Sequence, residues 1–136
     1  MNFTAVLLAT ITMFAVGATW YMGPFSKIWG QIHGFDKLSK KEQKEAQAKM
    51  GPYYLVQIVI TFISAAVLSK LISILPNYSA YTLACLVWAG FVLPAQVSAV
   101  IFGGTEPKWI AKKSSIMTSE ALLHLLIAAW VIGLIQ

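Results

Sequence analysis

The chain has 136 residues, enough for one domain; 58% of them are hydrophobic and 11% are charged. A soluble domain carries about 25% charged residues, so this composition indicates a membrane protein. The net charge of +5 comes from lysine alone, and the absence of arginine argues against nucleic-acid binding. No Cys/His ligand spacing, glycine-rich phosphate loop or Ser–His–Asp set occurs, so we expect no cofactor, and the sequence points away from an enzyme.

Four apolar runs follow one another along the chain. Each has about 20 residues or more, which at a rise of 1.5 Å per residue spans a hydrocarbon core of about 30 Å. Lipid offers the backbone no hydrogen-bond partner, so each run is predicted to be a helix. The first run lacks the basic start of a signal peptide and is predicted to be retained. We therefore predict an all-α fold, a four-helix transmembrane bundle in which residues 1–136 form a single membrane domain, with helices at about 2–22, 53–75, 81–102 and 112–135.

A short polar helix is predicted between the first two runs. The letters "SKKE" have the spacing of a capping box, with Ser39 as N-cap and Glu42 three residues later. The stretch "KKEQKEAQAKM" is polar on all sides, and Gly51 and Pro52 are typical of a helix end followed by a helix start. We interpret this helix as a solvated cytoplasmic connector. A surface for a partner or for anionic lipid is the alternative.

The third run contains "WAGFVLPAQ", in which a proline lies inside a predicted helix. Pro94 removes the hydrogen bond to the Gly90 carbonyl, so a kink is predicted there. A packing kink and a functional hinge or gate both remain open as explanations.

The lysines predict the orientation of the chain. Six lie between the first and second runs and three between the third and fourth, and an even number of crossings places both connections on one side. Only Lys70 lies near the other side, together with both termini. Because positively charged loops stay in the cytoplasm, we predict cytoplasmic lysine-rich loops and external termini, in the cell (inner) membrane.

The fourth run contains "SSIMTSEALLHLL", which places an acid and an imidazole inside a predicted membrane span. Glu120 and His124 are four residues apart and therefore lie on one helix face. Ionisable groups are costly in lipid, so we expect both to face the bundle interior. Gln57, Thr61 and Gln96 fall at a similar depth in the second and third runs. These five residues form a predicted polar intramembrane network. It offers too few ligands for a zinc ion, so no metal site is predicted.

Two functional classes remain open. The first is a non-catalytic structural or accessory membrane component, a homo-oligomer or a subunit of a larger membrane complex, with the lipid bilayer as its other partner and no nucleic acid. The second is a small proton- or cation-linked transporter or channel-like protein that uses Glu120 and His124. Water or an ion beside Glu120 would favour the second class, and a dry, packed interior the first.

The first run ends in "GATWYMGPFSKIW". This stretch resembles a family of small bacterial integral membrane proteins, domain of unknown function 1761. The matching residues are Trp20, Tyr21, Pro24, Phe25, Lys27 and Trp29. The "WAGFVLP" of the third run, Phe102 and His124 are also similar to the family, whereas Leu123 stands where the family often has an aromatic residue. The resemblance implies a four-helix bacterial membrane protein and brings no established activity.

The same motif is predicted to anchor the chain at the membrane interface. Trp20 and Tyr21 would hold the helix end at headgroup depth. Pro24 would end the helix, Lys27 would reach lipid phosphates, and Trp29 would lay the chain back on the interface. The alternative is that this motif borders the mouth of a pocket above Glu120.

Overall fold

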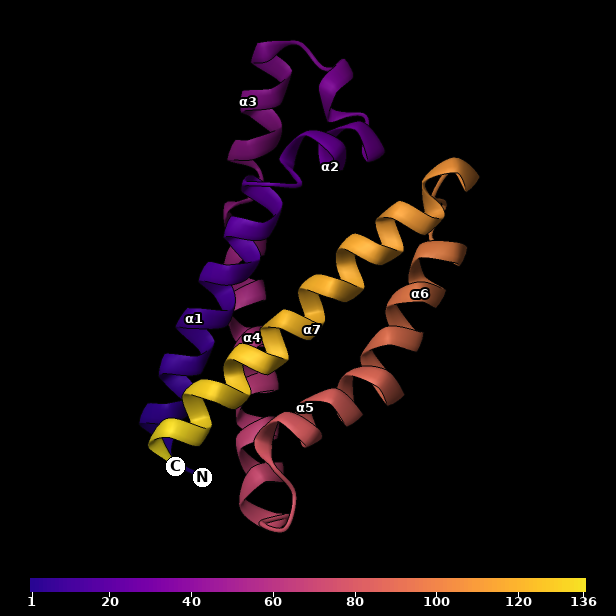
Figure 1. Ribbon diagram of the computed structural model, residues 1–136. Helices are drawn as coiled ribbons and strands as arrows, with labels where there is room; N and C mark the ends of the chain where they lie inside the picture. Colours follow the sequence, from indigo (N-terminus) through magenta and orange to yellow (C-terminus); the bar gives the residue numbers. More distant parts are fainter.

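The computed structural model describes all residues from 1 to 136, and its regular elements are helices (Figure 1). Four helical spans are long and apolar enough to cross a membrane. They are α1 (Phe3–Met22), α4 (Gly51–Ile74), a third span made of α5 (Ala80–Val87), η2 (Trp88–Val92) and α6 (Leu93–Phe102), and α7 (Ile110–Ile135). The connections hold α2 (Ser26–Ile32), η1 (Phe35–Lys37), α3 (Lys40–Ala48) and η3 (Pro107–Trp109). The predicted all-α class with four apolar spans is confirmed.

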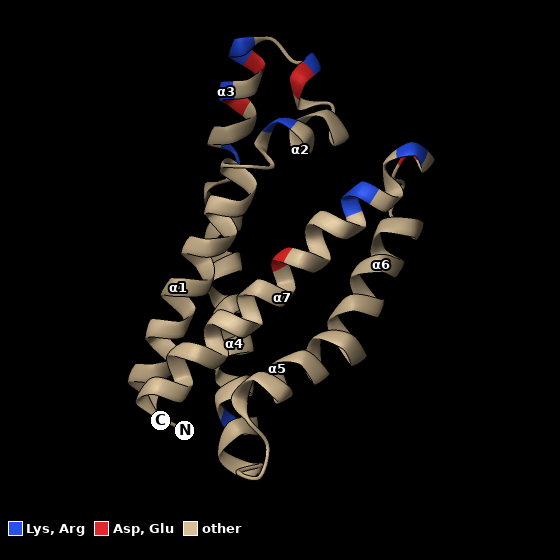
Figure 2. Cartoon of the chain, viewed as in Figure 1, with Lys and Arg blue, Asp and Glu red and all other residues tan.

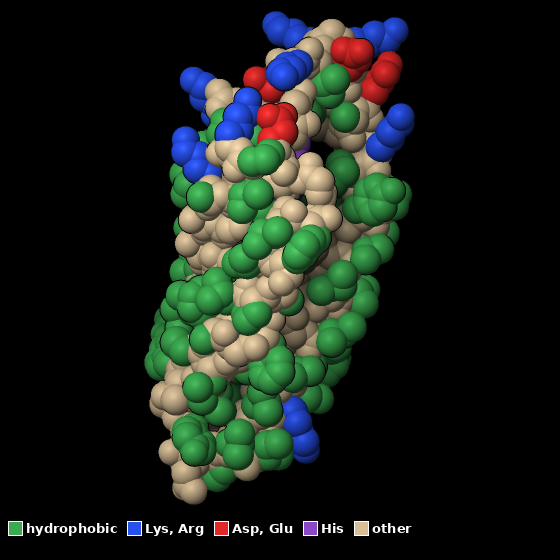
Figure 3. All heavy atoms as spheres, turned by 90° about the vertical axis from the view of Figure 1, so that its right-hand side faces the viewer, with side chains coloured by type: hydrophobic (Ala, Val, Ile, Leu, Met, Phe, Trp, Pro, Cys, Tyr) green, Lys and Arg blue, Asp and Glu red, His purple; other side chains and the backbone are tan.

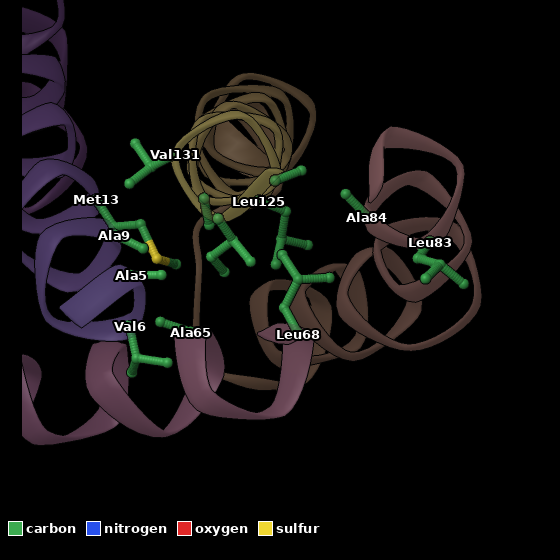
Figure 4. Close-up of a cluster of buried hydrophobic side chains, with 13 residues drawn as sticks. Ala5, Val6, Ala9, Met13, Ala65, Leu68, Leu83, Ala84, Leu125 and Val131 are labelled. Carbon is green, nitrogen blue, oxygen red and sulfur yellow. The ribbon is translucent and has the colours of Figure 1, made fainter. Parts of the chain in front are cut away.

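Helix α7 is the central element of the bundle, since it packs against α1, α4 and the third span. The hydrophobic core contains 13 buried side chains, and many of them are alanines (Figure 4). Ala5, Ala9, Ala65, Ala84 and Ala128 have no exposed surface. Small side chains let helix backbones approach closely, which is how helices gain packing contacts where lipid provides no hydrophobic driving force. The helices therefore approach one another most closely at these alanines.

The two chain ends lie together at the end of the bundle opposite α2 and α3 (Figure 1). The Gln136 side chain accepts a hydrogen bond from the Ser69 hydroxyl and donates to the Ser69 carbonyl and the Ser73 hydroxyl of α4. Asn2 caps α1 by accepting from the backbone N–H of Ala5 at 3.2 Å. The Asn2 backbone N–H also donates to Gln136 Oε1 at 3.5 Å. Polar contacts thus join the first, second and fourth spans at this end, which we call the terminal end.

The lysines gather at the opposite end, which we call the lysine end (Figure 2). They lie on the segment from α2 to α3 and around the connection from α6 to α7, whereas Lys70 alone is near the terminal end. Figure 3 shows the same separation on one face of the molecule, where apolar side chains cover the flank between the lysines gathered at one end and the single lysine toward the other. Charge and hydropathy are therefore distributed as a bilayer-spanning bundle requires.

The third span changes direction between α5 and α6 (Figure 1). Its middle is the π-helical segment η2, at whose end the N–H of Leu93 donates to the Trp88 carbonyl, five residues earlier. Pro94 follows at once and has no N–H to continue the normal ladder. The kink predicted at Pro94 thus takes the form of a π-helical turn in the preceding residues. Such wide turns are common where a helix is interrupted.

The predicted capping box at the start of α3 is present. The Ser39 N–H donates to the Glu42 carboxylate at 2.7 Å, and the Glu42 N–H donates to the Ser39 hydroxyl at 3.2 Å. Helix α2 contains Trp29, the residue predicted to lay the chain back on the interface. Its aromatic contacts connect it to α1 and to the loop that follows, since the ring of Trp29 lies 4.6 Å from that of Tyr21 and 4.5 Å from that of His33.

The capping box predicts a pH dependence for α3. Hydrogen bonds from the backbone N–H and then the side chain of Ser39 hold the pKa of Glu42 below its ordinary value of 4.5. A lowered folded-state pKa stabilises the helix fully above the unfolded value, and this contribution disappears as pH falls through the folded-state pKa. We expect amide hydrogen exchange in α3 to accelerate below about pH 4.5 beyond the intrinsic pH effect. The Glu42→Gln variant has no titrating carboxyl at this position, so it should show little added change on acidification; an unchanged pH profile in that variant would contradict the assignment.

Candidate functional site

A cavity of about 340 Å³ lies between the four spans, on the lysine side of the alanine-rich core. Met22 and Tyr54 are 77% and 50% exposed and form its outer part, whereas Thr61 and Glu120 are 3% and 6% exposed and form its inner part. The five residues of the predicted polar network all line this cavity: Gln57, Thr61, Gln96, Glu120 and His124.

The position of the cavity follows from the helix packing. Toward the lysine end, α6 and α7 diverge from α1 and α4 (Figure 1). Toward the terminal end, the fully buried alanines belong to α1, α4, α5 and α7, and these helices pack closely there. Residues 51–60 of α4 are all exposed, whereas the same helix buries Thr61, Ala65, Leu68 and Ser69 further along. The bundle is therefore packed in one half and hollow in the other, and the polar residues lie at the boundary.

Glu120 and His124 form the deepest charged part of the cavity. Both project from α7, and His124 Nε2 lies 2.8 Å from Glu120 Oε1. Their side chains are 8% and 16% exposed. The approach lies outside hydrogen-bond geometry, and neither atom has another hydrogen-bond partner in the protein. A buried carboxylate oxygen and a ring nitrogen are thus left with capacity for water or a ligand.

Gly17 of α1 brings the backbone of the first span against this pair. A β-carbon at this position would lie 2.8 Å from His124 Nε2 and 3.1 Å from Glu120 Oε1. A side chain at this position would therefore press on both polar tips. Sequence reasoning missed Gly17, although an isolated glycine inside an apolar helix is a recognised sign of close packing.

The remaining polar residues enter the cavity from two other helices. Gln57 Nε2 donates to Thr61 Oγ1 at 3.4 Å, and Thr61 Oγ1 donates to the Gln57 carbonyl at 2.7 Å, so these bonds stay within α4. Gln96 Oε1 of α6 is buried and has no hydrogen-bond partner. The five residues therefore share one cavity without direct hydrogen bonds between helices. Their action as a single network stays a prediction.

Two tryptophans hold α7 directly before Glu120. The Trp20 indole N–H donates to the Ile116 carbonyl at 3.2 Å, and the Trp88 indole N–H donates to the Thr118 carbonyl at 2.8 Å. Trp20 belongs to α1 and Trp88 to the π-helical segment of the third span, so α7 is bound from two helices. Trp88 begins the family-like "WAGFVLP" stretch, but the sequence does not reveal this contact, because the partner is a backbone carbonyl 30 residues away.

The predicted anchoring motif divides into two groups. Pro24 and Lys27 are exposed at the lysine end, where lipid headgroups would lie. Tyr21 instead lines the cavity, and its ring lies 4.6 Å from that of Trp29. Trp20 is bonded to α7, as described above. Anchoring by this motif stays a prediction, and the position of Tyr21 agrees with the alternative that the motif borders a pocket mouth.

The donor set of the cavity is limited. No three His, Cys, Asp or Glu side chains come together anywhere in the protein in a way that suits a metal ion. In the cavity itself, Glu120 and His124 are the acidic and imidazole groups, and amide, hydroxyl and phenol groups supply the other polar atoms. Such a set suits small polar solutes and protons better than a coordinated transition metal.

Comparison with known proteins identifies the family. The family model described as a protein of unknown function (DUF1761) matches residues 4–133, nearly the whole chain. No curated protein and no solved structure matches the chain. The resemblance noted around "GATWYMGPFSKIW" is therefore confirmed, and the chain belongs to this family of proteins of unknown function.

Proposed function

We propose that the protein is a small proton- or cation-linked transporter that crosses the cell membrane four times. The observation that carries this proposal is the cavity of about 340 Å³ whose wall contains the buried Glu120–His124 pair, in which Glu120 Oε1 lies 2.8 Å from His124 Nε2 and accepts no hydrogen bond. An ionisable side chain inside a membrane costs ~3 kcal/mol or more, and such residues mark ion and proton pathways. A carboxylate kept only for packing would be expected to have its hydrogen bonds satisfied.

The shape of the bundle supports a carrier rather than an open pore. The cavity has exposed residues toward the lysine end, whereas the alanine-rich core closes the path toward the terminal end. Access from one side at a time is what a carrier requires. The π-helical turn before Pro94 supplies an interrupted helix beside the cavity, and interrupted helices can adopt a second packing more easily than continuous ones.

The orientation of this carrier follows from its lysines. Positive charge at the lysine end supports an orientation with the cavity mouth toward the cytoplasm and both termini outside. A periplasm-active reporter enzyme fused after Gln136 should therefore be active, and a cytoplasm-active reporter at the same position should be inactive. The reverse result would place the mouth on the outer side. A reporter inserted in the 36–40 segment provides the matched control, since it should give the opposite pattern.

Transport is tested by proton flux in reconstituted vesicles that contain a pH-sensitive dye. With a potassium diffusion potential as driving force, the parent protein should acidify or alkalinise the lumen in the direction of the potential. Glu120→Gln should fold normally and reduce this flux at least tenfold, because the amide cannot carry a proton. Glu106→Gln, a change at an exposed loop carboxylate, should retain the parent rate. Equal rates in both variants would contradict the proposal.

A structural or accessory role in an oligomer or a larger membrane complex is the second candidate. It is favoured by the third span, in which 6% of the apolar segment is buried, compared with 39% for the span that contains α7. A face this open is available to another protein as well as to lipid. This role requires a parent protein without Glu120-dependent flux and a mass in lipid nanodiscs above that of one chain.

A further inference from the structure

The charged groups of the cavity wall indicate the sign of the charge on a ligand that would bind there. Glu120 is the one acidic group in the cavity wall, and no lysine lines it. The nearest lysine along α7 on the same stripe, Lys113, lies with its Nζ 5.9 Å from the centre of the Trp29 ring. That lysine is therefore engaged outside the cavity. His124 is the one group in the wall that can offset the negative charge of Glu120, and it does so only when its imidazole is protonated. Beside a neutral imidazole the site is negative and favours a positively charged ligand.

The unsatisfied atoms define which chemical group the ligand must offer. Glu120 Oε1 and Gln96 Oε1 are both buried, both acceptors, and both without a hydrogen-bond partner. They come from α7 and α6, two different walls of the same cavity. A ligand that pairs with both oxygens must supply an N–H or O–H donor to each of them. An ammonium group offers three donors and a full positive charge.

The rest of the wall favours an organic ion over an inorganic one. Phe14, Tyr21 and Tyr54 line the cavity, and aromatic faces attract organic cations. A water molecule occupies about 30 Å³ of liquid, so a cavity of about 340 Å³ accepts a ligand of roughly ten non-hydrogen atoms. The wall supplies Glu120 and His124 but no third His, Cys, Asp or Glu side chain to hold a metal ion.

We propose that the cavity binds a small organic ammonium ion, whose N–H groups pair with Glu120 and Gln96 and whose apolar part packs against the aromatic side chains. This assignment rests on the proposed transport function and gives it a substrate class: the cation that enters from the lysine end is a primary amine in its protonated form. Gly17 contributes by leaving room for the Glu120 and His124 side chains beside α1.

The test uses the full chain in lipid nanodiscs and calorimetric titration with butylammonium. We expect saturable binding that is at least tenfold tighter than for 1-butanol or butyrate, which match its size but lack its charge or reverse it. Tetramethylammonium should also bind at least tenfold more weakly, because it carries the charge without N–H donors. Equal binding of 1-butanol or tetramethylammonium would overturn the proposal.

Variants connect the binding to the named residues. Glu120→Gln should abolish butylammonium binding, whereas Glu106→Gln should leave it unchanged. Gln96→Leu replaces the acceptor with an apolar side chain and should weaken binding about tenfold. It provides the test if Glu120→Gln does not fold. Undiminished binding in Gln96→Leu would overturn the predicted contact.

The two proposals fail separately. Proton flux that depends on Glu120, together with no butylammonium binding to the parent, would overturn the ammonium assignment and leave proton transport standing. Absence of both would overturn both proposals. Butylammonium binding without proton flux would support the assigned ligand and contradict proton transport.

Discussion

The Gly17→Ala variant should fold and yet lose about tenfold or more of its Glu120-dependent proton flux. The added β-carbon would lie 2.8 Å from His124 Nε2 and 3.1 Å from Glu120 Oε1, so both side-chain tips must move. These tips are the ends of rotatable side chains and can shift without displacing the backbone. Alanine also favours a helix over glycine by about 0.5–1 kcal/mol, which offsets the crowding. The substitution should therefore reduce the proton flux more than the free energy of unfolding.

Gly133→Ala is the matched control, because it makes the same change in α7 where no atom would lie within 4 Å of the new β-carbon. It should retain the parent flux and gain up to about 1 kcal/mol of stability. Flux in vesicles and thermal unfolding in detergent, measured on both variants, separate the two effects. Parent-like flux in Gly17→Ala would show that the Glu120–His124 arrangement is not needed for transport.

Ala128→Leu should be among the most destabilising single substitutions in the bundle, with a loss of about 3 kcal/mol in the free energy of unfolding. Ala128 has no exposed surface and lies in the core formed by α1, α4, α5 and α7. Extra methylene groups in a packed core force side chains and backbones apart, at a cost of about 1–3 kcal/mol. Here the alanines set the helix separation itself, so the upper end of that range is expected.

Ala99→Leu provides the control, because Ala99 is exposed on α6 and its replacement adds the same volume toward lipid. Its free energy of unfolding should stay within about 0.5 kcal/mol of the parent value. Denaturant unfolding in mixed micelles, followed by tryptophan fluorescence, compares the two variants directly. Similar losses in both would mean that the alanine contacts do not determine the helix separation.

The candidate site was partly visible before the structure. Glu120 and His124 stand out because ionisable residues are rare in apolar runs, and Gln57, Thr61 and Gln96 could be placed at their depth by counting residues from the helix ends. Gly17 and Trp88 could not be found this way. Their roles depend on residues of another helix. Gly17 faces the tips of the Glu120 and His124 side chains, and Trp88 donates to the Thr118 carbonyl.

The sequence alone determined the class of the protein, its four spans, the capping box of α3 and the separation of lysines from apolar surface. These properties depend on hydropathy, helix rise and local hydrogen bonds, which act over a few residues at a time. The tertiary structure alone decided that α7 is central, that alanines close one half of the bundle, and that the other half encloses a cavity. The packing of helices in lipid depends on the shapes of facing surfaces, and the faces that meet become known only when the spans are assembled.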